Sequence, residues 1–220
     1  GVPQNKVRLI PNILPFNKID TNAINNGKRR GRSYFVWVTN AAPHKNHRRA
    51  VAALIKYYEV FNGNLECHVV GVNSSNLLTS DAPHLQGIGL MLDRSLRAKN
   101  KIKWLGDLSN FAYEQQISNA AFLWHPATVD NGTYSVIEAA ELQVPSLCSD
   151  YPAMREIESI CELGIVWMNS KDVQDISRKI KWMEDNSESL VMNTKLPDQL
   201  RNEFILNSEK FWAEISTLLM

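Results

Sequence analysis

Short, continuously apolar segments alternate with segments of helical periodicity along most of this chain. The apolar segments have strand length but no polar face, as in YFVWVT (34–39) and AFLWH (121–125). Strands of this kind lie in parallel sheets that helices cover on both faces. The sequence therefore predicts an α/β fold, a Rossmann-like doubly wound parallel sheet with right-handed connections. We expect strands at 34–39, 65–71, 102–106, 121–125, 145–149 and 164–168, and helices at 45–61, 83–99, 109–120, 134–142, near 152–158 and over most of the remaining carboxyl-terminal part.

Two flanking segments differ from this pattern. Residues 1–33 are polar and punctuated by proline, and we expect an interdomain linker and opening segment there, with a short strand within 7–16. The Rossmann-like domain is expected at 34–206 and a carboxyl-terminal helix at 207–220. Since the chain opens with Gly1 rather than Met, we expect it to be part of a longer protein. A basic cluster indicates a solvated linker or, as an alternative, a contact with an anionic membrane surface; its members are Lys28, Arg29, Arg30 and Arg32.

Charge and cysteine content argue against several classes of protein. The chain has 24 basic and 23 acidic side chains and a formal net charge of +1, so it lacks the basic excess of a nucleic-acid binder. No apolar run approaches the ~20 residues of a membrane span, and the sequence does not open like a secretory signal. Cys67, Cys148 and Cys161 are an odd number without metal-ligand spacing. We expect them to be buried thiols in a reducing, cytoplasmic compartment.

The stretch DNGTYSVIE (130–138) joins a predicted strand to a predicted helix and is unusually polar for such a junction. The amides of Thr133, Tyr134 and Ser135 would be free donors in the first turn of the helix, where the helix dipole also favours an anion. Gly132 would let a phosphate or diphosphate approach the backbone. Asp130 and Glu138 would then flank the anion and accept hydrogen bonds from hydroxyl groups. An alternative is that Asp130 caps the helix and Glu138 lies on the surface.

Histidine provides two further candidates. His44 and His47 have a spacing that can hold a metal on a helix, but no third ligand is close in sequence, and Lys45 between them would repel a cation. His125 ends a predicted strand beside the polar junction. It could contact a phosphate or be a hydrogen-bonded histidine of the core.

Several motifs in a fixed order resemble the donor-binding half of GT-B glycosyltransferases of the retaining family-4 type, also called glycosyl transferases group 1. The acid, seven residues and Glu of the junction resemble the donor-site signature of that family, within HPATVDNGTYSVIEAAELQVPSLCSD (125–150). FVWVTNAAPHKNH resembles its first strand and Lys-Asn turn, LECHVVG its second strand, and IKWLGDLSNFAYEQQISNAAFLWHP the path to the donor site. The resemblance covers about 7–16 and 34–219.

The resemblance implies a role for each matching residue. Asp130 corresponds to the first acid, which contacts hydroxyls of the donor sugar, and Glu138 to the second, which holds the ribose. Residues 132–135 correspond to the backbone segment around the diphosphate, and Lys45 to the lysine that neutralises the leaving diphosphate. The nucleobase would lie at Trp104, Leu105 and Gly106.

Three positions depart from the pattern of the family. The first acid is Asp130 rather than the usual Glu, and Asn131-Gly132-Thr133 replaces Gly-Phe-Gly. Asn40 stands in the donor site where many members have an arginine, so a phosphate contact would be missing. Arg94 or Arg48 could supply the missing positive charge.

The resemblance implies a retaining transfer of a hexosyl group from a GDP-, UDP- or dTDP-linked sugar to a hydroxyl of a glycan or lipid-linked acceptor. No metal or other cofactor is expected, and a missing amino-terminal domain would hold the acceptor. Assembly of a bacterial surface polysaccharide in the cytoplasm is expected, with a peripheral contact at the inner membrane face left open. One alternative is a catalytically inactive nucleotide-sugar-binding or scaffold module. Another is an NAD-binding domain, although the first strand lacks a following Gly-x-Gly-x-x-Gly.

Overall fold

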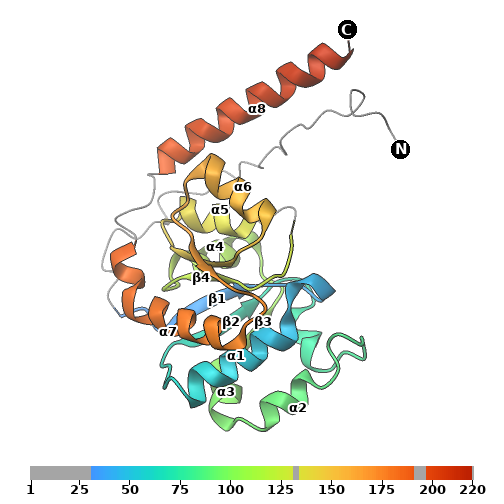
Figure 1. The fold of residues 1–220 in the computed structure, drawn as a ribbon, viewed down its shortest axis with the longest axis vertical. Coiled ribbons are helices and arrows are strands. Elements are labelled where there is room, and N and C mark those ends of the chain that lie inside the picture. The colour runs from blue at the N-terminus through green and yellow to red at the C-terminus, as the bar shows by residue number, and fades with distance from the viewer. Residues whose placement is uncertain (1–30, 131–133, 191–196, 220) are drawn as a thin grey trace.

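A six-stranded parallel sheet forms the centre of the molecule (Figure 1). The computed structural model describes residues 31–130, 134–190 and 197–219. The strand order is β3-β2-β1-β4-β5-β6, so the chain winds outward from β1 in its first half and from β4 in its second. The doubly wound α/β fold predicted from the sequence is confirmed, and all six strands lie within or overlap the expected segments. They are β1 (Tyr34–Val38), β2 (Glu66–Val70), β3 (Ile102–Gly106), β4 (Leu123–His125), β5 (Ser146–Ser149) and β6 (Val166–Met168).

Helices cover both faces of this sheet, as Figure 1 shows. On one face lie α1 (His47–Glu59), α2 (Ile88–Asp93), α3 (Leu96–Lys101) and α7 (Val173–Leu190), and on the other α4 (Asn110–Ser118), α5 (Tyr134–Glu141) and α6 (Pro152–Cys161). A further helix, α8 (Pro197–Leu219), extends away from the sheet.

The alternation of side chains along each strand divides the core into two layers. In β1, Phe35 and Trp37 pack against the α1 side, whereas Val36 packs against the α5 side. All three side chains are buried, which is why the strand has no polar position for the solvent. Trp124 of β4 continues the first layer, with its ring centroid 5.2 Å from that of Trp37. The three cysteines are free and buried, as expected.

The single helix predicted at 83–99 is wrong, because the chain forms two short helices there. Gly87 precedes α2 with a positive φ of 77°, and the helix ends at Asp93. Ser95 then has an extended backbone, and its hydroxyl accepts a hydrogen bond from the amide of Ala98. An extended N-cap residue cannot continue the preceding helix, so Ser95 starts α3 instead.

The described carboxyl-terminal residues are mostly helical, as expected. Helix α8 runs through the boundary expected after residue 206, whereas the division into domains stays a prediction. Its first turns are held by Leu200, which is buried in the α5-side layer, while Ile205, Leu206 and Trp212 are exposed. None of the described helices combines the length and apolar composition of a membrane span.

The predicted strand at 7–16 and the basic residues Lys28, Arg29 and Arg30 lie outside the described residues. Arg32 is described, and its guanidinium donates hydrogen bonds to the carbonyls of Ser118 and Ala120 at the end of α4. One member of the basic cluster therefore stabilises a helix terminus.

Candidate functional site

A cavity of about 380 Å³ opens at the carboxyl ends of β1, β2, β3 and β4. In doubly wound sheets this edge, where the winding reverses between β1 and β4, is the usual position of a ligand site. The cavity brings together residues from segments far apart in sequence. Its lining is Val38, Thr39, Asn40, Lys45, Gly71, Val72, Asp107, Leu108, Asn110, Tyr113, His125, Asp130, Tyr134, Ser135 and Glu138.

Lys45 and Asp130 form an ion pair inside this cavity. The Nζ atom of Lys45 lies 2.5 Å from Oδ2 of Asp130, and the two side chains are only 15% and 11% exposed. Both residues were predicted for the site from separate motifs. Their contact requires the β1–α1 connection and the β4–α5 connection to meet, as the sheet order dictates.

The backbone around Lys45 is held by hydrogen bonds to two other connections of the fold. Lys45 ends a 3₁₀ turn, Pro43–Lys45, and Asn46 follows with a φ of 62°. The buried amide group of Asn46 donates to the carbonyl of Pro126 at 3.0 Å and to that of Ser170 at 2.9 Å. The amide of Thr128 donates to the carbonyl of His44 at 2.8 Å. The position of the lysine is thus fixed by the segments that follow β4 and β6.

Glu138 lines the cavity from the second turn of α5. Val136, Ile137, Ala139 and Ala140 on the same helix are buried, which leaves Glu138 at the cavity wall. The hydroxyl of Tyr113 donates a hydrogen bond to Oε2 of Glu138 at 2.7 Å. Burial raises the pKa of Glu138, and this hydrogen bond opposes that change. Glu138 is therefore half-buried at the wall of this cavity, and its role as a site residue stays a prediction.

The first turn of α5 also contributes to the cavity wall. Tyr134 and Ser135 line the cavity, as the anion-site hypothesis expects. Gly132 and Thr133, together with Asn131, lie outside the described residues. The amino end of a helix with Asp130 before it and Glu138 within it can hold an anion between two groups that accept hydroxyl hydrogens.

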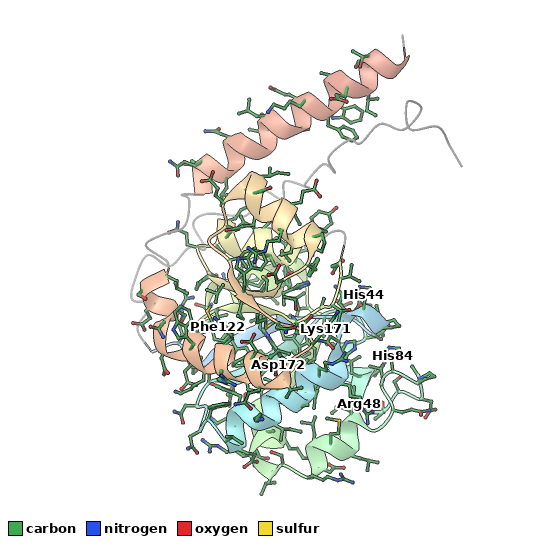
Figure 2. All side chains as sticks on the ribbon, in the orientation of Figure 1. His44, Arg48, His84, Phe122, Lys171 and Asp172 are labelled. Atoms are coloured by element: carbon green, nitrogen blue, oxygen red, sulfur yellow. The ribbon has the colours of Figure 1, made fainter. Side chains whose placement is uncertain are left out.

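The two arginines considered as replacements for the missing positive charge lie elsewhere in the structure. Asn40 lines the cavity, and its Oδ1 accepts a hydrogen bond from the amide of Ala42 at 3.0 Å. Arg48 donates to the carbonyl of Gln86 at 2.8 Å and, with His84, lines a different cavity. Figure 2 labels both side chains. Arg94 is exposed at the end of α2. Neither Arg48 nor Arg94 lines the cavity that contains Lys45.

The three residues predicted for the nucleobase lie beside the cavity lining and not in it. Trp104 packs near Trp37, with 6.4 Å between ring centroids, and Leu105 is 38% exposed. The carbonyl of Gly106 accepts a hydrogen bond from the amide of Gly71 at 2.8 Å. On this side of the cavity the lining is formed by residues that follow β3 directly, Asp107, Leu108 and Asn110, and by Tyr113 of α4. Their position after a strand was a usable signal, because side chains at carboxyl strand ends face the ligand edge.

His125 is both a cavity residue and a hydrogen-bonded buried histidine. It is 2% exposed, and its Nε2 lies 3.2 Å from the hydroxyl of Tyr151 and 4.0 Å from Oδ2 of Asp130. His47 contacts the carbonyl of Asn40 through Nε2 at 2.7 Å. Among the described residues, no three His, Cys, Asp or Glu side chains are grouped so that they could hold a metal ion.

Acidification from pH 7 to pH 5 should lower the free energy of unfolding. Burial lowers the pKa of His125 to about 3 and that of His47 to about 4, from an unfolded value of 6.5. Below pH 6.5 these histidines bind protons in the unfolded chain but not in the folded protein. The stability present above pH 6.5 is therefore lost as the pH falls toward the pKa values of the folded state. The loss is about 2 kcal/mol for each ring at pH 5.

Urea denaturation at several pH values, followed by tryptophan fluorescence, measures this effect. In a His125→Asn variant the loss between pH 7 and pH 5 should shrink by about half, because one of the two rings is removed. Equal stability of the unaltered protein at both pH values would contradict the prediction.

Comparisons with known proteins agree with this architecture. A family model described as "Glycosyl transferases group 1" matches residues 18–206. A search of the curated proteins finds no significant match. Among solved structures, a UDP-forming α,α-trehalose-phosphate synthase from Burkholderia xenovorans has a TM-score of 0.63 and 13% identity over 87% of this chain and 46% of its own. A sucrose-phosphate synthase from Thermosynechococcus elongatus has a TM-score of 0.57 and 14% identity over 89% and 49%.

A glycosyltransferase from Rickettsia africae has a TM-score of 0.53 and 13% identity over 80% of this chain and 47% of its own. At these identities the solved structures show a shared fold. The chain spans about half the length of the structures it matches, between 46% and 49% for these three.

Proposed function

The chain belongs to the family of group 1 glycosyl transferases, and from this premise we propose that its cavity binds the nucleoside diphosphate sugar of a hexosyl transfer reaction. One observation carries the proposal. A single cavity brings Lys45, Asp130, the first turn of α5 and Glu138 together, although they come from two halves of the sheet. The order of groups along α5 suits a sugar, a diphosphate and a ribose in sequence.

Each group has a distinct chemical role in this proposal. Glu138 accepts hydrogen bonds from the two vicinal hydroxyls of the ribose, and the amides at the start of α5 hold the diphosphate. Asp130 contacts hydroxyls of the transferred sugar. Lys45 lies within 2.5 Å of Asp130 and can turn from that carboxylate to the leaving diphosphate. Its positive charge stabilises the negative charge that develops on the leaving group.

We further propose that the transfer retains the configuration at the anomeric carbon and requires no divalent metal. Lys45 and the α5 amides provide the charge stabilisation that a metal ion would otherwise supply. The acceptor is a hydroxyl group of a glycan or a lipid-linked saccharide, with cell-surface polysaccharide assembly as the biological setting. Because the matched structures are about twice as long, with 46% of the first covered, we assign acceptor binding to a part of the enzyme outside these residues.

Calorimetric titration with GDP, UDP, dTDP and ADP tests the proposal. We expect one nucleotide to bind at micromolar strength, about −8 kcal/mol. A Glu138→Ala variant should lose at least about tenfold in affinity, because a charge-assisted hydrogen bond to the ribose is removed. Glu188→Ala is the matched control, since Glu188 is an exposed carboxylate of α7, on the other face of the sheet. A well-folded protein that binds none of the four would count against a donor site in this cavity.

A second candidate is a binding module that holds a nucleotide sugar without transferring it. Asn40 favours this alternative, because its uncharged side chain lines the cavity at the position where the family often has an arginine. The two candidates differ in turnover. Release of free nucleotide from the bound sugar nucleotide by the complete enzyme supports catalysis, whereas tight binding without release supports the module.

A further inference from the structure

The charge of Glu138 is not balanced by a neighbouring cation in the described part of the chain. Its hydrogen-bond donor there is the neutral hydroxyl of Tyr113, 2.7 Å from Oε2. Lys45, which lines the same cavity, is paired with Asp130. Glu114, next to Tyr113 on α4, adds a negative charge that raises the pKa of Glu138. Glu138 is thus a half-buried carboxylate that one phenol stabilises.

Tyr113 is placed to do this by the fold. It extends from the second turn of α4, which Ser109 caps, and reaches Glu138 on the neighbouring helix α5. Both side chains line the cavity. Burial and the adjacent carboxylate raise the pKa of Tyr113, so its hydroxyl keeps its proton and remains a donor at neutral pH. The hydrogen bond therefore joins two helices at the wall of the proposed donor site.

We propose that Tyr113 is a positioning residue that orients Glu138 and keeps it in the carboxylate form required to accept the ribose hydroxyls. The inference rests on the proposed function. It adds that Tyr113, acting through Glu138, favours nucleotides that carry both ribose hydroxyls. A carboxylate bonded by one phenol retains lone pairs for two further hydroxyls. A protonated Glu138 would carry a donor in place of an acceptor and would lose the charge-assisted bonds.

Removal of the phenol hydroxyl should make nucleotide binding depend on pH. Without this donor the pKa of Glu138 rises further, so the side chain becomes protonated at a higher pH. As the pH is lowered, the affinity for a ribonucleotide should then begin to fall at a higher pH in the variant than in the unaltered protein. Other titratable or charged groups that face Glu138 are the same in the variant; they are Glu114 of α4, Asp107 after β3, the Lys45–Asp130 pair, and Tyr134 of α5.

The experiment compares the unaltered protein with Tyr113→Phe. Calorimetry at pH 6 and pH 8 uses the nucleoside diphosphate that binds the unaltered protein and its 2′,3′-dideoxy analogue. We expect Tyr113→Phe to bind the ribonucleotide about tenfold more weakly, because the hydrogen bond that orients Glu138 is lost. The difference between the two proteins should be larger at pH 6 than at pH 8. The dideoxy analogue should bind both proteins equally. Tyr34→Phe is the control, because its hydroxyl donates to the carbonyl of Gln116 on the same helix α4 at 3.0 Å but does not line the cavity.

Equal affinities of Tyr113→Phe and the unaltered protein for the ribonucleotide at both pH values would overturn the inference. So would an equal loss for the dideoxy analogue, because Tyr113 would then shape the cavity in general. If the unaltered protein binds no nucleotide, the proposed function fails first and the inference fails with it. Carbon-13 NMR titration of the Glu138 carboxyl, without ligand, measures the effect of the Tyr113 hydroxyl on the pKa of Glu138 directly. An unchanged pKa in Tyr113→Phe would overturn the inference even where nucleotides bind.

Discussion

Replacing Lys45 with methionine should weaken binding of a nucleoside diphosphate by about 100-fold and leave binding of the uncharged nucleoside unchanged. Two effects add. The attraction between the ammonium group and the diphosphate is lost. Asp130, which lies 2.5 Å from Nζ and is 11% exposed, then loses this ammonium group and keeps its negative charge beside the ligand anion. Methionine preserves much of the apolar stem of lysine, so the change is mainly one of charge.

A double variant separates these two effects. Adding Asp130→Asn to Lys45→Met removes the repelling carboxylate and should restore part of the affinity, about tenfold. Asp130→Asn alone should bind the nucleoside diphosphate at least as well as the unaltered protein, because Lys45 is then released from its ion pair. Calorimetry in low and high salt measures all four proteins. Unchanged affinity in Lys45→Met would show that the lysine does not contact the diphosphate.

Replacing Gly71 with alanine should lower the free energy of unfolding by more than about 3 kcal/mol. Gly71 follows β2 with a φ of 126°, a conformation that side chains rarely adopt. A Cβ atom there would lie 2.1 Å from the carbonyl oxygen of Thr39. The backbone must therefore move, and both Gly71 and Thr39 line the cavity. We expect nucleotide binding to be lost together with stability.

Gly87→Ala is the matched control for this prediction. Gly87 also has a positive φ, 77°, but the nearest atom to its added Cβ is Nη1 of Arg48 at 3.8 Å. Its replacement should cost about 1–2 kcal/mol, the ordinary penalty of a left-handed alanine. Urea denaturation measures the free energy of unfolding of both variants. Gly87→Ala introduces backbone strain alone, whereas Gly71→Ala introduces backbone strain and a steric clash. Equal losses in both would contradict the steric argument at Gly71.

The fold could be predicted because each strand is recognisable from its own short apolar sequence. Phe35, Val36 and Trp37 are consecutive apolar residues, and all three are buried. Such a run indicates a strand in a sheet that is covered on both faces. Alternation with helices then restricts the topology to a doubly wound sheet. Ser95 shows where this reasoning ends. Periodicity across 83–99 continues through it, and only the extended backbone at Ser95 divides α2 from α3.

The site could be predicted in part. Asp130, Glu138 and Lys45 were identified in motifs, and the structure brings them to one cavity. Tyr113 was not predicted because it contacts Glu138 on the next helix, with strand β4 between the two in the sequence. A contact between residues so far apart in sequence leaves no local pattern. The nucleobase position at Trp104, Leu105 and Gly106 stays a prediction. The residues that follow Gly106 line the cavity instead, because the chain turns inward only after β3 has ended.

The strand order has a consequence for the folding reaction. Strands β1 and β4 join the two halves of the sheet. There Val36 pairs with Leu123, which is far away in the sequence. Non-local pairing of this kind closes a long loop and slows folding. Lys45 belongs to the first half, and Asp130 and Glu138 to the second. An intermediate with only one half folded would contain no complete cavity, so a bound nucleotide would act on the native state and slow unfolding while leaving the folding rate nearly unchanged.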